Sequence, residues 1–402
     1  MKPFPSLLSF SEALSIVEAN IKPLTRTEIV GIDEASGRVL AETVVAGLSV
    51  PSFDRAAMDG YAVIAGDTIG SSRQNPKILN KLAGELHAGE TLETSIKTVE
   101  CFQIATGAMV PLGADAVVPV EDTEATNGMV KVFKPVPHGA NISQKGEDIK
   151  EGETILKHGI VLDAGKIGVL ASQGLTNVEV YAKPGVAILS SGEEVSELGG
   201  KLKQGSIYDV NSHTIAAVVR ENGGIPHISG VVHDNPAEIK TKIAEALDND
   251  AVVISGGSSV GERDLLVDAL HGWGKILFHG IQVKPGKPTL FAKVQGKPLF
   301  GMPGPPTSCL MQSLLFLAPA VRKMAHLPPK AERKITLKLA CRVHGLVDRK
   351  QFLNVRVEGD EAVPVFKKSG AITSVAGTDG YIEIPADIEF IEKGTAVTVT
   401  LF

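Results

Sequence analysis

Apolar runs and amphipathic segments alternate along residues 185–326. The runs at 185–192, 225–232 and 251–257 are rich in β-branched and other apolar residues, which predicts buried strands. Amphipathic segments between these runs predict helices, and residues 305–326 read as one long apolar helix. Strands that alternate with helices indicate an open, mainly parallel sheet with right-handed crossovers. This region is therefore expected to be an α/β domain.

Two other regions have the pattern of small β-domains. Short β-like runs bounded by turn residues fill residues 50–137, and alternation typical of strands marks residues 331–402. Residues 9–20 predict an amphipathic helix with Ser11 as its cap, and residues 166–174 predict another helix. The predicted domains are a discontinuous N-terminal domain, a small β-domain, the α/β domain and a C-terminal β-domain, over residues 1–46 with 141–181, 47–140, 182–326 and 327–402.

The composition narrows the classes of protein that fit this pattern. The chain has 402 residues, of which 43% are hydrophobic, and this excludes a wholly disordered chain. A net charge of −6 argues against partners such as nucleic acid or an anionic membrane. The longest apolar run, residues 314–321, is far too short to cross a bilayer. Three well-separated cysteines and the lack of a signal-peptide core lead us to expect a cytoplasmic protein.

Four loops rich in Gly, Ser, Thr or Lys follow predicted strands of the α/β domain, at residues 190–194, 255–261, 284–288 and 301–308. Glycine lets backbone N–H groups approach a ligand, while hydroxyls and lysines bind phosphate oxygens. One such loop is an ordinary turn, but four at one sheet edge favour an anionic, phosphate-bearing ligand. The sequence contains neither a Walker motif nor GxGxxG after a strand, so an ordinary P-loop or dinucleotide fold is disfavoured.

Acidic residues accompany the same loops, and they are Glu193, Glu194, Asp209, Asp234 and Asp264. Hard oxygen ligands close to phosphate suit Mg²⁺. Helix capping alone would explain Asp234 and Asp264, because each precedes a predicted helix, and solvated loop charges are the alternative for the others. The histidines are scattered and give no support to a zinc site or a Ser-His-Asp triad.

Residues 51–63, PSFDRAAMDGYAV, place Asp59 and Gly60 immediately before a predicted strand. The structural alternative is a tight turn with Asp59 as its Asx residue. The segment closely resembles the PxFDxSAMDGYAV signature of the MoeA family, the molybdopterin molybdenumtransferases, which include the E domain of gephyrin. Further matches follow in the family's order, with TGA at 106–108, PLGADAVV at 111–118, KGED at 145–148, SSGEE at 190–194, DVN at 209–211, SGGSSVG at 255–261, KPGKP at 284–288 and GMPGPPTS at 301–308.

The resemblance implies a fold and a reaction. Members of this family have an elongated four-domain subunit, form a homodimer and contain one domain that resembles the MogA fold. The implied activity is ligation of molybdate to the dithiolene of adenylylated molybdopterin, with Mg²⁺-dependent release of AMP, to form molybdenum cofactor. A molybdopterin adenylyltransferase is the further partner that the resemblance suggests, and tungstate replaces molybdate in some organisms.

The family's site residues carry over to matching positions in this chain. The implied catalytic residues are Asp59, Asp148, Glu194, Asp234, Lys284 and Lys287. The implied Mg²⁺ ligands are Glu194, Asp234 and Asp264. The implied substrate-binding residues are Thr106, Ser190, Ser191, Gly192, Ser255, Gly256, Gly257, Ser258, Gly261, Pro303, Gly304, Thr307, Ser308 and Ser374. Asp59, Thr106 and Asp148 lie in the N-terminal half, which in this family faces the other subunit's α/β domain, so the resemblance implies a site shared across the dimer.

Three places depart from the family pattern, and the mildest is Arg55-Ala56, which stands in place of a frequent Asn-Ser. Ser191 stands where the family often has Thr, and it keeps the hydroxyl. Pro305 stands where the family usually has Asn, which removes an amide side chain and a backbone N–H from a loop expected to bind anions.

The alternatives to the molybdate-inserting enzyme are a tungstate-inserting paralogue and a molybdopterin-binding scaffold without catalysis. A third, an enzyme that adenylylates molybdopterin itself, is not favoured by the N-terminal signature.

Overall fold

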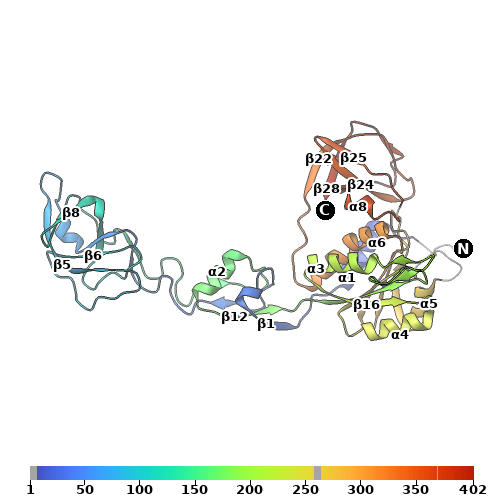
Figure 1. Ribbon diagram of the computed structural model, residues 1–402, viewed down its shortest axis with the longest axis horizontal. Coiled ribbons are helices and arrows are strands. Elements are labelled where there is room, and N and C mark those ends of the chain that lie inside the picture. The colour runs from blue at the N-terminus through green and yellow to red at the C-terminus, as the bar shows by residue number, and fades with distance from the viewer. Residues whose placement is uncertain (1–6, 258–263, 369) are drawn as a thin grey trace. The chain divides into compact units, whose positions relative to one another are not determined.

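The computed structural model describes residues 7–257, 264–368 and 370–402. The chain divides into two compact units, the first made of residues 1–28 with 181–402 and the second of residues 29–180 (Figure 1). In the part of the chain that is described, no helix is both long and apolar enough to cross a membrane.

A six-stranded sheet is the centre of the α/β part of the first unit, with strand order β16-β13-β17-β21-β20-β18. These strands are β13 (Gly185–Ser191), β16 (Ile225–Val232), β17 (Ala251–Ser255), β18 (Gly274–His279), β20 (Leu290–Val294) and β21 (Lys297–Met302). β13 pairs in parallel with β16 and β17, and β17 pairs in parallel with β21. β20 runs antiparallel to both β21 and β18. The predicted open, mainly parallel sheet is confirmed, with its two antiparallel pairings at one edge.

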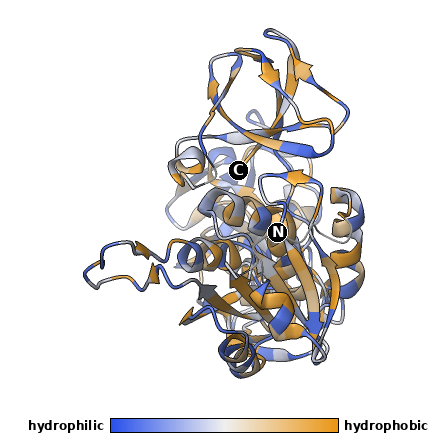
Figure 2. Ribbon diagram, turned by 90° about the vertical axis from the view of Figure 1, so that its right-hand side faces the viewer, coloured by the Kyte–Doolittle hydropathy of each residue, from blue (hydrophilic) through white to orange (hydrophobic). Residues whose placement is uncertain are grey.

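Helices cover both faces of this sheet. They are α1 (Phe10–Asn20), α3 (Asn211–Glu221), α4 (Pro236–Ala246), α5 (Leu265–Leu270), α6 (Pro306–Gln312) and α7 (Ala318–Met324). Val186 and Ile188 pack with α1, α3 and α6, whereas Ala187 and Leu189 point to the other face and pack with α4 and α5. Figure 1 shows these two layers, and in Figure 2 the strands between them are mostly hydrophobic.

Two details of the helices differ from the sequence predictions. The segment predicted as one helix over 305–326 is α6, a π-helical turn at Ser313–Leu317, and α7. Pro319 has no N–H to donate to the preceding turn, and the π turn accommodates this loss. The prediction that Ser11 caps the first helix is wrong, because the Ser9 hydroxyl accepts the Glu12 N–H and the Glu12 side chain accepts the Ser9 N–H.

The C-terminal region of the first unit is a β-structure closed on itself. Its strands are β22 (Lys334–Leu339), β24 (Lys350–Glu358), β25 (Glu361–Pro364), β26 (Gly380–Ile384) and β28 (Ala396–Leu401), beside the short β23 (Val343–His344), β27 (Phe390–Ile391) and α8 (Thr373–Ala376). The order β24-β25-β22-β28-β26, with a further pairing of β26 to β24, closes a five-stranded barrel. β19 (Val283–Lys284), which comes from the α/β part, adds to this barrel in parallel with β24.

The second unit contains a six-stranded sheet of order β7-β4-β6-β5-β9-β8. Its strands are β4 (Gly60–Val63), β5 (Lys77–Leu86), β6 (Glu100–Ile104), β7 (Ala116–Pro119), β8 (Thr123–Thr126) and β9 (Met129–Val132). A separate apolar cluster joins residues 35–44 to 156–180 around α2 (Ala164–Ser172). Short strands form two-stranded pairs. β1 (Thr27–Gly31) pairs with β12 (Asn177–Tyr181), β2 (Val44–Val45) with β11 (Thr154–Leu156), and β3 (Arg55–Ala56) with β10 (Ile142–Ser143). In the first unit, β14 (Val195–Ser196) pairs with β15 (Ile207–Tyr208). The predicted small β-domains are thus present, and the fold class, a multidomain α/β plus β protein, is confirmed.

Candidate active site

The loops predicted to bind an anion meet at the carboxyl edge of the first unit's sheet. Ser190 at the end of β13 is level with Ser255 at the end of β17, and Ser255 is level with Met302 at the end of β21. The loops that follow these three strands therefore begin side by side. This is the edge at which open α/β sheets bind their ligands.

A buried cluster of three serines and an aspartate links the first two of these loops. The Ser190 hydroxyl donates to Oδ1 of Asp209 at 2.8 Å and lies 2.9 and 3.0 Å from the hydroxyls of Ser212 and Ser255. Asp209 Oδ1 also accepts the Ser212 N–H at the start of α3, at 3.0 Å. All four residues are buried. The predicted substrate-binding hydroxyls of Ser190 and Ser255 therefore support the loops from below, and contact with a ligand would come from the loops above them.

Glycines let these loops approach one another closely. A Cβ atom on Gly256, which has φ +81°, would lie 2.2 Å from the Ser191 carbonyl oxygen, and one on Gly257 would lie 3.2 Å from the Ser191 hydroxyl. Gly192 has φ +151°, and a Cβ there would come within 2.9 Å of Glu194 Oε2. No other residue type fits at Gly256 without a backbone shift. The predicted contacts Ser258 and Gly261 lie outside the described residues.

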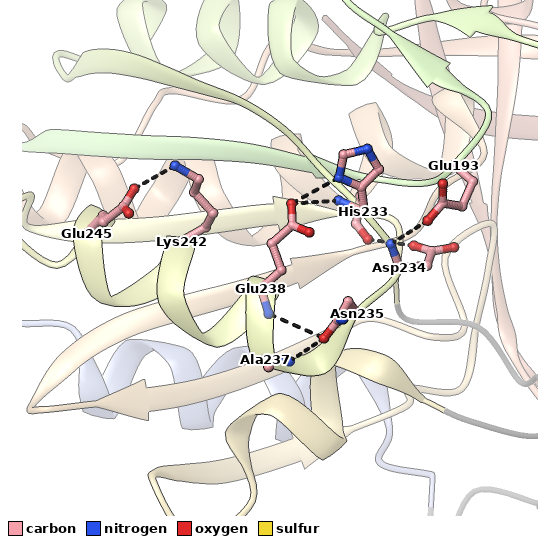
Figure 3. Close-up of polar contacts among 9 residues, drawn as sticks. Glu193, His233, Asp234, Asn235, Ala237, Glu238, Lys242 and Glu245 are labelled. Atoms are coloured by element: carbon pink, nitrogen blue, oxygen red, sulfur yellow. Dashed lines mark hydrogen bonds and ion pairs between the residues drawn. The ribbon is translucent and has the colours of Figure 1, made fainter.

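Two of the predicted acids lie beside the loop after β13. The Ser191 hydroxyl donates to Asp234 Oδ1 at 2.9 Å, and the Asp234 N–H donates to Glu193 Oε1 at 3.2 Å. Figure 3 shows Glu193 and Asp234 together just before α4. The cap of α4 is not Asp234 but Asn235, whose Oδ1 accepts the Ala237 N–H. Helix capping, the structural alternative for Asp234, is therefore wrong, and its carboxylate is directed to the loop.

His233 has a partner within the same segment. Its Nδ1 lies 3.1 Å from Glu238 Oε1, and this hydrogen bond, helped by the charge of Glu238, raises the pKa of the exposed imidazole above its ordinary value. Figure 3 shows the Glu238 side chain turned from α4 toward His233. The contact to Glu238 gives His233 a role on the exposed surface beside α4.

Asp264 is a helix cap and an ion-pair partner at the same time. Its Oδ1 accepts the Val267 N–H at 3.2 Å at the start of α5, and its Oδ2 lies 3.0 Å from Nε2 of His279 at the end of β18. Both side chains are largely buried. The capping role considered for Asp264 is therefore present, and each of its carboxylate oxygens already has one partner within the protein.

The acids at this edge match the chemistry of Mg²⁺ in part. Across the described ranges, no three His, Cys, Asp or Glu side chains come together as a metal-binding group. Magnesium does not require such a group, because it is normally held by one or two carboxylates with phosphate and water. Asp234, with Glu194 folded over Gly192 nearby along the loop, supplies the oxygen donors that such a site needs.

The predicted lysine loop lies at the same edge but follows an antiparallel strand. His279 of β18 pairs with Leu290 of β20, which pairs with Gly301 of β21, so the end of β18 is level with the end of β21. Lys284 is exposed and its backbone pairs with Gln351 of the barrel. The C-terminal barrel therefore anchors the loop that carries Lys284 and Lys287.

The segment around α8 in the C-terminal region also contacts the first turn of α6, which follows β21. The Thr307 hydroxyl donates to the Ala371 carbonyl at 3.1 Å and lies 2.9 Å from the Ser374 hydroxyl. Asn211 Nδ2 donates to the Gly304 carbonyl at 2.8 Å. Thr307 and Ser374 are buried, so their hydroxyls join the two parts of the unit. Pro303 and Ser308, the remaining predicted contacts of this loop, are buried as well.

The second unit gathers its motif residues into a cluster of its own. Asp59 Oδ1 accepts the Thr106 hydroxyl at 2.6 Å and the Thr106 N–H at 2.7 Å. These two bonds hold the pKa of Asp59 below its ordinary value, so the exposed carboxylate is ionised at neutral pH. The Asp148 N–H donates to the Val50 carbonyl, which brings the KGED segment next to the signature. A plain Asx turn does not explain Asp59, because its partner is 47 residues away.

Sequence reasoning missed three residues of this arrangement. Asp209 was recognised only as one loop acid, and its burial beneath two loops was not foreseen. His279 follows an apolar run and gave no sign that it pairs with Asp264. Gln312 lies inside a predicted apolar helix, where a single amide in an apolar stretch was the available signal.

Three family models match the chain in succession. "MoeA N-terminal region (domain I and II)" matches residues 8–174, "Probable molybdopterin binding domain" matches residues 187–323, and "MoeA C-terminal region (domain IV)" matches residues 336–402. Together they cover both units, including the sheet edge with its loops.

Curated relatives and solved structures agree with these matches. A putative molybdopterin biosynthesis protein of Methanocaldococcus jannaschii is 34% identical over 415 residues, 100% of each chain. A molybdopterin molybdenumtransferase of Staphylococcus epidermidis is 33% identical over 381 residues, 92% of this chain and 90% of the relative. The crystal structure of a molybdopterin biosynthesis MoeA protein from Pyrococcus horikoshii superimposes with a TM-score of 0.86 at 38% identity, over 98% of this chain and 99% of that one. The chain belongs to the MoeA family and is a transferase.

Proposed function

We propose that this protein ligates molybdate to the dithiolene of adenylylated molybdopterin, releases AMP and so forms molybdenum cofactor. The observation that carries the proposal is the meeting of the loops after β13, β17 and β21 at one sheet edge, beside Asp234 and the lysine loop. This part of the chain matches the probable molybdopterin binding domain, and relatives along its whole length are named molybdopterin molybdenumtransferase.

The chain's own groups have separate tasks in this reaction. Backbone N–H groups of the glycine-rich loops bind phosphate oxygens of the substrate, and Ser190, Ser255 and Asp209 keep those loops in place. Lys284 and Lys287 neutralise the charge of phosphate and molybdate and stabilise charge that develops on the phosphoryl group. Asp234 and Glu194 would hold Mg²⁺, which neutralises charge on the departing AMP phosphate.

Asp59, Thr106 and Asp148 belong to the second unit, and we propose that they act in the site of a partner subunit within a homodimer. A mixture of Asp59→Asn subunits and Lys284→Met subunits tests this idea. Mixed dimers of a shared site contain one intact site, so mixing two inactive variants should restore up to a quarter of the wild-type rate. No recovery after subunit exchange, confirmed by mass, would contradict a shared site.

The experiment for the reaction itself is one incubation with adenylylated molybdopterin, Mg²⁺ and either molybdate or tungstate. We expect AMP release and cofactor formation to rise together with molybdate, and Lys284→Met to abolish both. Asp248→Asn, a change at an exposed residue after α4, is the matched control that should keep the wild-type rate. A higher rate with tungstate would favour the tungstate-inserting paralogue, and substrate binding without AMP release with either anion would favour the scaffold.

The proposed substrate is made by adenylylation of molybdopterin. We therefore expect an adenylyltransferase of the same compartment, the cytoplasm, to supply it and to act as a partner. Co-purification of the two proteins, with faster AMP release than from free substrate, tests this expectation.

A further inference from the structure

A fully buried glutamine lies against the lysine loop. Gln312 ends α6, is 0% exposed, and donates from Nε2 to the Pro285 carbonyl at 2.7 Å. Its Oε1 atom is buried and has no hydrogen-bond partner within the described residues. The orientation of the amide follows from chemistry, because the Pro285 carbonyl can only accept a hydrogen bond. Gln312 therefore holds the loop by a directed bond.

The loop backbone is fitted to this side chain. Gly286 has φ +108°, and a Cβ atom there would lie 2.3 Å from Gln312 Nε2, so the peptide of Gly286 rests directly on the amide. Two further bonds fix the same loop, from the Ile281 N–H to the Lys287 carbonyl at 2.9 Å and from the Thr289 hydroxyl to the Gly286 carbonyl at 2.7 Å. Gln312 adds a side-chain bond from α6, beside the backbone pairing of Lys284 with Gln351 of the barrel.

The same helix carries the neighbouring loop. Ser308 precedes Gln312 by four residues, so the two side chains lie on one face of α6. α6 begins where the loop after β21 ends, and a π-helical turn follows Gln312 directly, a feature frequent at functional sites. A shift of α6 therefore moves the loop at 301–308 and the loop at 284–288 together.

Packing alone does not account for a glutamine at this place. Its neighbours on the helices, Cys309, Met311 and Phe316, are 0% exposed and belong to the apolar core. Methionine has the same length and would fill this volume without leaving a buried oxygen unpaired. What glutamine adds is the bond to Pro285.

We propose that Gln312 is a positioning residue of the oxyanion site, which sets the place of Lys284 and Lys287 and with it the affinity for molybdate. This inference rests on the proposed function and deepens it. It predicts a larger effect on the KM for molybdate than on the KM for the pterin substrate, because the substrate phosphates also meet the glycine-rich loops, which this bond does not reach.

The test compares Gln312→Met with Asn222→Leu, which makes the same change in a buried amide at the C-terminal end of α3, the end away from the loops. For Gln312→Met we expect the KM for molybdate to rise about tenfold, as the loss of one directed bond allows. The KM for adenylylated molybdopterin should stay within about twofold, and Asn222→Leu should change neither. Calorimetric binding of molybdate to the protein without pterin substrate should show the same loss of affinity.

A second variant keeps the test valid if Gln312→Met folds poorly. Gly286→Ala leaves the core untouched but pushes the loop off the Gln312 amide, so it should reproduce the higher KM for molybdate. An unchanged KM for molybdate in a folded Gln312→Met protein, or an equal rise in Asn222→Leu, would overturn the inference. If the wild-type protein releases no AMP, the proposed function is wrong, and the calorimetric affinities of wild type and variants still decide the role of Gln312.

Discussion

Replacing Asp209 with alanine tests whether the buried network beneath the loops supports them. In the wild-type protein, Asp209 Oδ1 accepts the Ser190 hydroxyl and the Ser212 N–H. The substitution removes both acceptor contacts from a place where water has little access, because Asp209 is 6% exposed. Among the described residues no Lys, Arg or His forms an ion pair with Asp209. Its stabilising contacts are therefore the hydrogen bonds from the Ser190 hydroxyl and the Ser212 N–H.

The expected loss of stability follows from these two bonds. The bond to the Ser212 N–H acts as a helix cap and contributes about 1 kcal/mol, and a hydrogen bond to a charged group contributes about 1.5–3 kcal/mol. Asp209→Ala should therefore lower the free energy of unfolding of the first unit by about 3 kcal/mol. For a unit of this size, that corresponds to a fall in Tm of about 6–12 °C.

Calorimetry on the full chain measures this change in the transition of the first unit, and Asp248→Ala at an exposed position is the control. Asp209→Asn keeps the acceptor oxygen and should recover about half of the lost stability. A loss below about 1 kcal/mol for Asp209→Ala would refute the view that this network supports the loops, and so would an equal loss for the two variants.

Three further predictions concern other contacts. Thr106→Val should raise the pKa of Asp59 toward its ordinary value, measured by carbon NMR of the carboxyl group, because it removes the hydroxyl donor. Burial alone would raise the pKa of Asp250, but the bidentate pair with Arg26 helps to lower it overall. The pair therefore stabilises the fold above about pH 4, and this contribution is lost as the pH falls through the depressed pKa of Asp250. Arg26→Met should lower the free energy of unfolding at pH 7 by about 1 kcal/mol, a small value because the guanidinium is partly exposed. When this free energy is measured by urea unfolding at a series of pH values, it should fall less steeply toward acid pH in the variant than in the wild type. Gly60→Ala should lower the free energy of unfolding of the second unit by about 3 kcal/mol, measured by urea unfolding. The added Cβ atom would lie 2.0 Å from a backbone oxygen of β7.

The sequence was sufficient to predict the central sheet and the loops at its edge. Strands β13 and β17 are buried on both faces, and such strands appear in the amino-acid sequence as continuous apolar runs. Their ends could be placed together because parallel strands finish at a common edge. The two antiparallel pairings of β20 were not visible, since a short apolar run does not state the direction of its neighbour.

The contacts within the site were beyond sequence reasoning. Asp264 and His279 meet only because β18 returns beside the start of α5, and no spacing rule covers such a pair. The hydrogen bond between Ser190 and Asp209 forms in a buried place, and that burial depends on the packing of α3 against the loops. Asp59 and Thr106 were singled out by the resemblance, whereas their direct bond required the pairing of β4 with β6.

The second unit interrupts the first one along the chain, and this has a consequence for synthesis on the ribosome. Val17 of α1 belongs to the same core as Val186 and Phe316. At about 5–20 residues per second, translation needs roughly 10–30 s after Val17 before the first of these partners has been made. During that interval the second unit is synthesised as a whole, while the apolar face of α1 has no core to enter. The nascent N-terminal helix is therefore the segment of this protein for which a chaperone would matter most.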